Sequence, residues 1–238
     1  MEEPIVLYED NHIIVVVKPQ GVPTMPDGSG DTDMLTIVKN YVKVKYNKQG
    51  EAFIGLLHRL DRPTGGVMVF ARTSKAASRL SEQIRNGDVQ KKYLAVTVGI
   101  PRERRARLVN ELLKDESTNT VRIVPVPCEG SKEAILDYKV LETYENKYAL
   151  VDVELVTGRG HQARVQLKGV GAPIFGDAKY GDGKEGRRNL ALWAYELLFT
   201  HPTTQKTMAF KAFPPTDKVP WKAFAVERYI NVSRPNFD

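Results

Sequence analysis

Short apolar runs separated by turn-forming residues recur along the chain. Apolar runs of strand length predict strands, and apolar residues spaced three and four apart predict helices. We expect strands at 5–8, 13–17, 53–57, 67–71, 92–98, 134–140, 148–156, 190–200 and 207–213. We expect helices at 35–46, 74–86, 162–170 and 220–229. This order predicts an α+β fold, with a mixed, mostly antiparallel central sheet and flanking helices.

Several boundaries rest on cap and turn residues. Ser74 is the expected N-cap of the second helix, and Asn86-Gly87 is expected to end it. Glu145-Asn146 is expected to join two strands as a hairpin. The polar, glycine-rich stretch 26–33 predicts a mobile loop, and the polar stretch 101–131 predicts a peripheral insertion.

The length and composition fit one globular domain, which we expect to span 1–238. No apolar run approaches the roughly 20 residues of a membrane span, and the N-terminus has no signal segment. The single cysteine, Cys128, excludes an internal disulfide and fits a reducing compartment. We therefore expect a cytoplasmic protein that is not bound to a membrane.

The distribution of charge adds a candidate partner. The net charge is +6, and basic residues form two groups: Arg102, Arg104, Arg105 and Arg107, then Arg72, Lys75, Arg79, Arg85, Lys91 and Lys92. The second group could be a solvated helical face, but an anionic polymer as partner is the favoured interpretation. The one cysteine and four histidines lack metal-ligand spacing, so we expect no metal.

The candidate chemistry lies in His58-Arg59-Leu60-Asp61-Arg62-Pro63-Thr64-Gly65-Gly66. Asp61 stands between two arginines, at a turn between two apolar runs. Such an aspartate could form a structural ion pair or brace its own turn. It could also be a catalytic carboxylate, which needs a fixed position of this kind. The segment alone leaves both interpretations open.

Four segments together carry a resemblance. They are 9–19 with Gly21; 58–61 with Thr64 and Gly66; 157–166; and 176–181 with 191–194 and His201-Pro202. In order and spacing they resemble the RluA-type family of pseudouridine synthases over nearly the whole chain. The resemblance implies the pseudouridine synthase fold and an isomerase that converts selected uridines of structured RNA, ribosomal or transfer, without cofactor or metal.

The resemblance also implies roles for individual residues. Asp61 matches the essential aspartate, and Tyr93 matches the active-site tyrosine. Arg164 matches the basic residue that pairs with the aspartate. Arg59 matches an arginine that helps to hold RNA with its target base displaced, and Gln162 lies in the same motif as Arg164. Arg62, beside Asp61, is expected to hold the opened RNA backbone.

Some points stay open at this level. Gly65, Ala163 and Trp193 depart from the residues usual in the family, which bears on pocket shape and target choice. Asp61 could attack C1′, stabilise positive charge, or take the C2′ proton. The alternatives to an enzyme of this family are a non-catalytic RNA-binding protein that retains the fold, and a nucleoside hydrolase. We expect a monomer without a separate N-terminal RNA-binding module.

Overall fold

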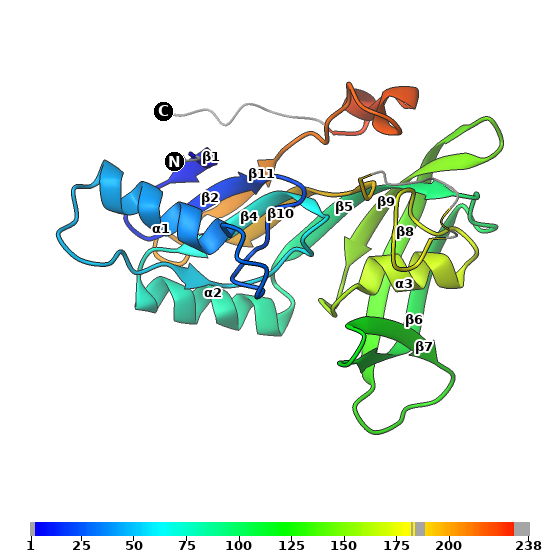
Figure 1. Cartoon of the computed structure of the whole chain (residues 1–238), viewed down its shortest axis with the longest axis horizontal. Helices are drawn as coiled ribbons and strands as arrows, with labels where there is room; N and C mark the ends of the chain where they lie inside the picture. The colour runs from blue at the N-terminus through cyan, green and yellow to red at the C-terminus, as the bar shows by residue number, and fades with distance from the viewer. Residues whose placement is uncertain (1–2, 182, 184–188, 231–238) are drawn as a thin grey trace. The chain divides into compact units, whose positions relative to one another are not determined.

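The computed structural model describes residues 3–181, 183 and 189–230. The chain forms two compact units, each described by itself below. The first comprises Met1–Lys91 and Glu196–Phe210, and the second Lys92–Tyr195 and Lys211–Asp238. Figure 1 labels their helices and strands.

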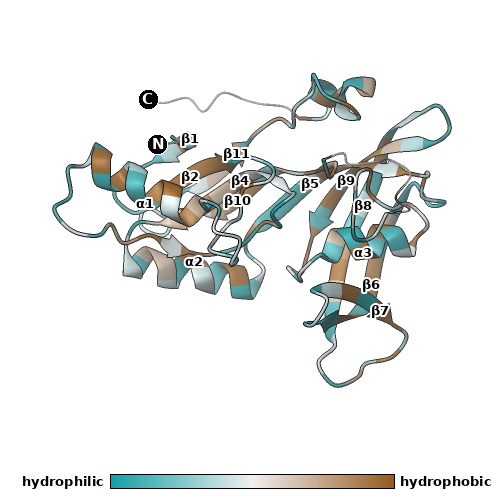
Figure 2. Ribbon diagram, in the orientation of Figure 1, coloured by the Kyte–Doolittle hydropathy of each residue, from teal (hydrophilic) through white to brown (hydrophobic). Residues whose placement is uncertain are grey.

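The first unit is built on an antiparallel set of strands. These are β1 (Ile5–Glu9), β2 (Ile13–Lys18), β3 (Gly55–Leu56) and β4 (Gly65–Ala71), with β2 between β1 and β4. In the strand order, β4 is followed by β10 (Leu192–Thr200). Strand β11 (Thr207–Lys211) pairs with β10. Every residue of β2 and β4 is buried, and both strands consist largely of apolar residues (Figure 2). Such buried, largely apolar strands fit a sheet that is covered on both faces.

Two helices of the first unit lie beside these strands (Figure 1). Helix α1 (Met34–Lys45) begins at Asp33, whose side chain accepts a hydrogen bond from the Thr36 amide. Helix α2 (Ser74–Asn86) packs on β4 and ends at Gly87, which has the left-handed conformation typical of a C-cap. The expected N-cap of α2 was wrong by one residue, because the hydroxyl of Thr73 caps the Ala76 amide and Ser74 is the first helical residue.

The second unit contains a longer antiparallel set. Its strands are β5 (Gln90–Val98), β9 (Tyr148–Leu155), β8 (Lys132–Tyr144), β6 (Arg105–Asp115) and β7 (Thr120–Val124), in that spatial order. Glu145 and Asn146 both have positive φ and form the expected turn between β8 and β9. The stretch expected as a peripheral insertion thus supplies β6 and β7 to this sheet.

Helix α3 (Gln162–Gly169) packs against β6 and β7. One of its residues, Val165, enters a core cluster with Leu112, Val121, Ala134 and Tyr180. The sheets and helices of the two units confirm the predicted α+β class with a mostly antiparallel sheet. Among the described helices, none is long and apolar enough to cross a membrane.

The expected helix at 220–229 was wrong. The segment forms two short 3-10 helices, η1 (Trp221–Ala223) and η2 (Val226–Arg228), separated by Phe224 in extended conformation. The Ala225 amide donates to a side-chain oxygen of Glu142, at 3.1 Å, rather than to a helical carbonyl. The apolar residues that suggested a helix, such as Trp221 and Phe224, are buried without forming a continuous helix. Tertiary contacts outweigh helix propensity here.

Candidate active site

Asp61 lies in the loop between β3 and β4 of the first unit, where it is half-buried. The Thr64 amide donates to the Asp61 carbonyl at 2.9 Å, which closes a tight backbone turn over residues 61–64. Its sequence neighbours Arg59 and Arg62 are both exposed. The structure therefore brings these three predicted residues together on one short loop.

A second segment, residues 18–24, is hydrogen-bonded along the Asp61 loop. The buried Thr24 hydroxyl donates to the Leu60 carbonyl at 2.8 Å and accepts from the Leu60 amide at 3.2 Å. The Gly21 amide donates to the Arg62 carbonyl at 2.9 Å. Gln20 donates to the Pro63 carbonyl, also at 2.9 Å. These bonds flank Asp61 on both sides and fix its backbone, as a positioned catalytic group requires.

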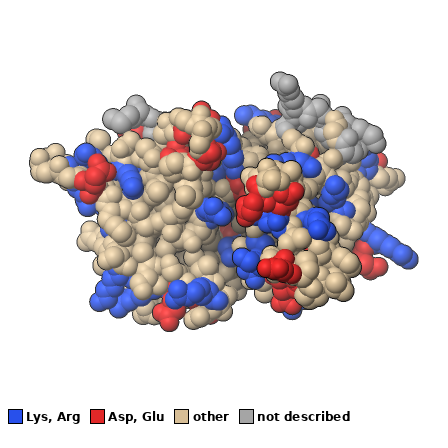
Figure 3. Space-filling view, turned by 60° about the horizontal axis from the view of Figure 1, so that its bottom comes forward, with Lys and Arg blue, Asp and Glu red and all other residues tan. Residues whose placement is uncertain are grey.

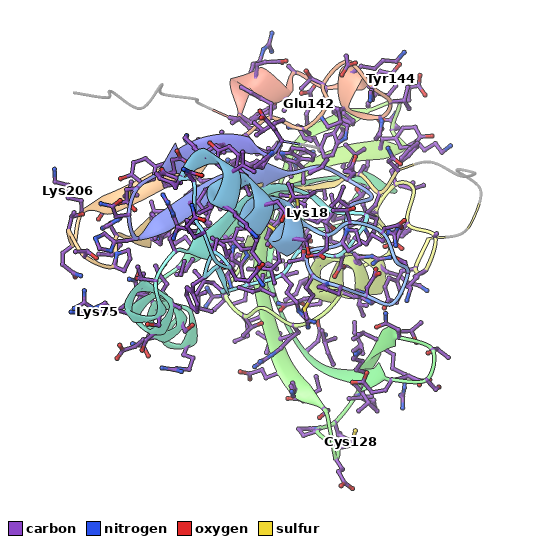
Figure 4. The ribbon with its side chains drawn as sticks, turned by 60° about the vertical axis from the view of Figure 1, so that its left-hand side comes forward. Lys18, Lys75, Cys128, Glu142, Tyr144 and Lys206 are labelled. Carbon is purple, nitrogen blue, oxygen red and sulfur yellow. The ribbon has the colours of Figure 1, made fainter. Side chains whose placement is uncertain are left out.

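Lys18 is the most unusual group near this loop. Its side chain is fully buried, whereas Lys75 and Lys206 project outward from the first unit (Figure 4). The ammonium donates to the carbonyls of Pro19 and Arg62, both at 3.0 Å. Burial lowers the pKa of Lys18 to about 7, with the Arg62 charge acting in the same direction and the Asp61 carboxylate opposing it. Lys18 thus anchors the Asp61 loop and places a titratable ammonium in its field.

Lys18 should give stability a measurable pH dependence. Between pH 7 and its ordinary pKa of 10.5, the unfolded chain binds this proton and the folded chain does not. Stability therefore rises with pH in that window, by up to about 1.4 kcal/mol per pH unit. Lys18→Met removes this contribution. We expect the free energy of unfolding of the wild type, minus that of the variant, to increase from pH 7 to pH 9 in urea titrations. Parallel stability curves would contradict this assignment.

His58 is a structural neighbour of the Asp61 loop rather than a proton donor. Its Nε2 accepts a hydrogen bond from the Val69 amide of β4 at 3.2 Å. Burial, reinforced by the charge of Lys91, lowers the pKa of His58 to about 4. The imidazole is therefore neutral at physiological pH, and it joins the start of the loop to the strand that follows it.

Arg164 lies on α3 of the second unit and is almost wholly buried. Its Nε and Nη2 donate to the two carboxylate oxygens of Asp177, at 2.8 and 2.6 Å. The amides of Lys179 and Tyr180 donate to the same carboxylate, each at 3.0 Å. Burial alone would raise the pKa of Asp177, but the Arg164 charge and these hydrogen bonds outweigh it and hold the pKa below its ordinary value.

Tyr180 supports the same arginine from another side. The Arg164 guanidinium lies 5.0 Å from the centre of the Tyr180 ring, within the range of a cation–π contact. The Tyr180 hydroxyl accepts from the Val121 amide at 2.8 Å and lies 2.6 Å from Nδ1 of His161. Arg164 is therefore fixed by both a charge partner and an aromatic face.

The remaining predicted residues also lie in the second unit. Gln162 is buried at the start of α3, where its Oε1 accepts from Thr157 and from the Arg159 amide, and its Nε2 donates to the Ile135 carbonyl. These contacts brace the helix start against β8. Tyr93 is buried on β5, opposite Val153 of β9. The roles that the resemblance implies for Gln162, Tyr93 and Arg164 toward RNA or Asp61 stay predictions.

Three supporting residues had no role in the sequence interpretation. All three lie inside the motif segments, but each has a partner distant in the sequence: the Arg62 carbonyl for Lys18, Arg164 for Asp177 and the Val121 amide for Tyr180. The sequence signal that could have pointed to Lys18 is a charged residue directly after an apolar run, as in Val15-Val16-Val17-Lys18. Among the residues that the structure describes, no group of three or more His, Cys, Asp or Glu side chains could hold a metal ion.

Comparisons with known proteins agree on one class. The family described as RNA pseudouridylate synthase matches residues 12–168. The uncharacterized RNA pseudouridine synthase YhcT of Bacillus subtilis is 33% identical over 214 residues, covering 89% of this chain and 69% of that protein. Ribosomal large subunit pseudouridine synthase C of Salmonella typhi is 36% identical over 223 residues, covering 90% of this chain and 67% of that protein. The chain thus spans about two thirds of the length of these relatives.

Solved structures give the same result. Human RNA pseudouridylate synthase domain containing 4 matches with a TM-score of 0.75 and 26% identity, over 89% of this chain and 88% of that one. Fold and comparisons together define an RNA-modifying isomerase. The chain belongs to the RluA-type family of RNA pseudouridine synthases, which confirms the resemblance and the fold drawn from its motifs.

Proposed function

We propose that this protein converts uridines of large-subunit ribosomal RNA to pseudouridine, with Asp61 as the catalytic carboxylate. The observation that carries the assignment of Asp61 is its loop, which backbone and side-chain hydrogen bonds from residues 18–24 hold on both sides. The choice of RNA is supported by the name of the relatives at 36% identity, ribosomal large subunit pseudouridine synthase C.

The reaction breaks the bond from C1′ to N1, turns the uracil and joins C1′ to C5, after which the C5 proton leaves. An ionised Asp61 serves this sequence by attacking C1′, by stabilising positive charge on the sugar, or by accepting the C2′ proton. In the first unit the Asp61 carboxylate acts on the buried Lys18 ammonium, whose pKa it raises against the effect of burial. The ionised carboxylate is the form that each of these routes needs.

The substrate must present its uridine outside the base stack, which costs a few kcal/mol in paired RNA and less in loops and bulges. We infer that Arg59, which is exposed beside Asp61, holds the opened backbone. Exposed Arg102, Arg104 and Arg105 offer further phosphate contacts. Arg107 is already bound through two hydrogen bonds to Asp137, at 2.8 and 2.7 Å. Acidic side chains are interspersed with the basic ones on the face in Figure 3, so phosphate binding is expected at particular arginines.

The proposal is tested by incubating the purified protein with unmodified ribosomal and transfer RNA transcripts, separately and without added metal. Nucleosides from each digest are then separated by chromatography. We expect pseudouridine in large-subunit ribosomal RNA. Product in transfer RNA alone would contradict the proposed substrate. Tight RNA binding without product in either RNA would indicate a non-catalytic RNA-binding protein.

A further inference from the structure

Arg62, next to Asp61, is held by two acidic side chains of the loop at 26–33. Its Nη1 lies 3.4 Å from Oδ2 of Asp27, and its Nη2 forms an ion pair with Asp31. Its Nε donates to the Gly21 carbonyl at 2.9 Å, which directs the outer edge of the guanidinium toward the two carboxylates. The loop expected to be mobile is thus bound to the residue that follows the proposed catalytic aspartate.

The two carboxylates are arranged as a pair. Oδ1 of Asp27 accepts from the Ser29 amide at 3.1 Å, and the Ser29 hydroxyl accepts from the Asp31 amide at 3.2 Å. These local bonds present both acids to one guanidinium. A phosphate group would offer that guanidinium the same set, namely anionic oxygens in reach of its two terminal nitrogens.

The contacts are of a kind that exchanges readily. The side chains of Arg62, Asp27 and Asp31 are 42%, 38% and 56% exposed. Ion pairs at such exposure contribute about 0–1 kcal/mol each, because water and salt compete with them. Gly28 and Gly30, between the two acids, have positive φ, and a Cβ atom added at either glycine would meet nothing within 4 Å. Packing therefore does not hold the tip of the loop in place.

We propose that Arg62 binds a backbone phosphate of the substrate RNA, and that Asp27 and Asp31 occupy this phosphate position in the free protein. The proposal rests on RNA being the substrate. Binding then exchanges two weakly held carboxylates for a phosphate, and the loop gives way as the RNA reaches Asp61. Asp27 and Asp31 act as competitors that lower the affinity for RNA phosphates at this point.

The test compares RNA binding by four proteins: the wild type, Asp27→Asn with Asp31→Asn, Arg62→Gln, and the three substitutions combined. The probe is a fluorescently labelled hairpin RNA with a uridine loop, and the Kd is measured by anisotropy. We expect the double asparagine variant to lower Kd about three- to tenfold. In the Arg62→Gln protein the same two substitutions should leave Kd unchanged, because the guanidinium that they release is absent.

The salt dependence gives a second readout. Arg62 contacts the phosphate in both the wild type and the double asparagine variant, so the two proteins should share the same slope of log K against log salt. The two proteins with Arg62→Gln should show a slope shallower by about 0.7, the contribution of one phosphate contact in single-stranded RNA. An unchanged slope after loss of Arg62 would overturn the phosphate contact, and equal tightening with and without Arg62 would overturn the exchange.

A matched control changes the same amount of charge elsewhere. Glu51→Gln with Glu116→Gln also removes two exposed acids, each of which faces a lysine in a surface ion pair. This control should change Kd by less than twofold. If the loop served only to brace Arg62, the double asparagine variant would bind RNA more weakly, which would overturn the proposal. Failure of the proposed function would show separately, as absence of pseudouridine from wild-type reactions.

Discussion

Asp61→Asn is expected to abolish pseudouridine formation while RNA binding and the fold survive. Asparagine has nearly the same size, but it lacks the charge and basicity that attack at C1′ or removal of a proton requires. We expect the single-turnover rate to fall at least about 10³-fold. The Kd for RNA should change little, because the phosphate contacts lie on arginines and lysines rather than on the carboxylate.

Two controls separate chemistry from structure in this experiment. Asp88→Asn makes the same substitution at an exposed residue of the first unit and should retain wild-type rates. Thermal unfolding of Asp61→Asn shows whether the loop survives, since its hydrogen bonds run through Leu60, Arg62 and Pro63 and do not need the carboxylate. A folded Asp61→Asn protein with full activity would show that the carboxylate has been assigned wrongly.

The second large effect is expected on stability, at Asp177. Asp177→Ala leaves the Arg164 guanidinium buried without the carboxylate that binds two of its nitrogens, and leaves two amides without their acceptor. Breaking a buried pair in this way costs about 3–5 kcal/mol. Urea unfolding monitored by circular dichroism measures the difference.

The exposed pair Arg107–Asp137 provides the matched control. It has the same two-bond geometry, at 2.8 and 2.7 Å, but its side chains are 61% and 39% exposed. Asp137→Ala should cost less than about 1 kcal/mol. Similar losses for Asp137→Ala and Asp177→Ala would show that burial does not set the strength of the Arg164 pair.

Local patterns in the sequence were sufficient to predict most of the helices and strands. Continuous β-branched runs such as Ile13–Val17 have few alternatives to a buried strand, and Asn86-Gly87 ends a helix by its own conformational preference. Local reasoning failed at 220–229, where Trp221 and Phe224 are both buried although the backbone is extended at Phe224, so tertiary contacts outweigh helical spacing. It also placed the N-cap of α2 at Ser74, since Thr73 and Ser74 have equivalent hydroxyls.

The supporting contacts of the site could not be predicted in the same way. Thr24 and Leu60 are separated by 36 residues, and Arg62 lies 35 residues from Asp27 and 31 from Asp31. Nothing local distinguishes those acids from other loop carboxylates. The motif resemblance supplied Asp61, Arg59 and Arg164, but the buried partner of Arg164, Asp177, follows only from the folded second unit.

The most direct measurement of the central claim is tritium release from ribosomal RNA labelled at C5 of uridine, because joining C5 to C1′ expels that hydrogen. Wild type and Asp61→Asn are compared at RNA concentrations that give equal occupancy. The account predicts release by the wild type, with pseudouridine at the matching sites, and none above background by Asp61→Asn. Equal release by both proteins would contradict the assignment of Asp61 as the catalytic carboxylate.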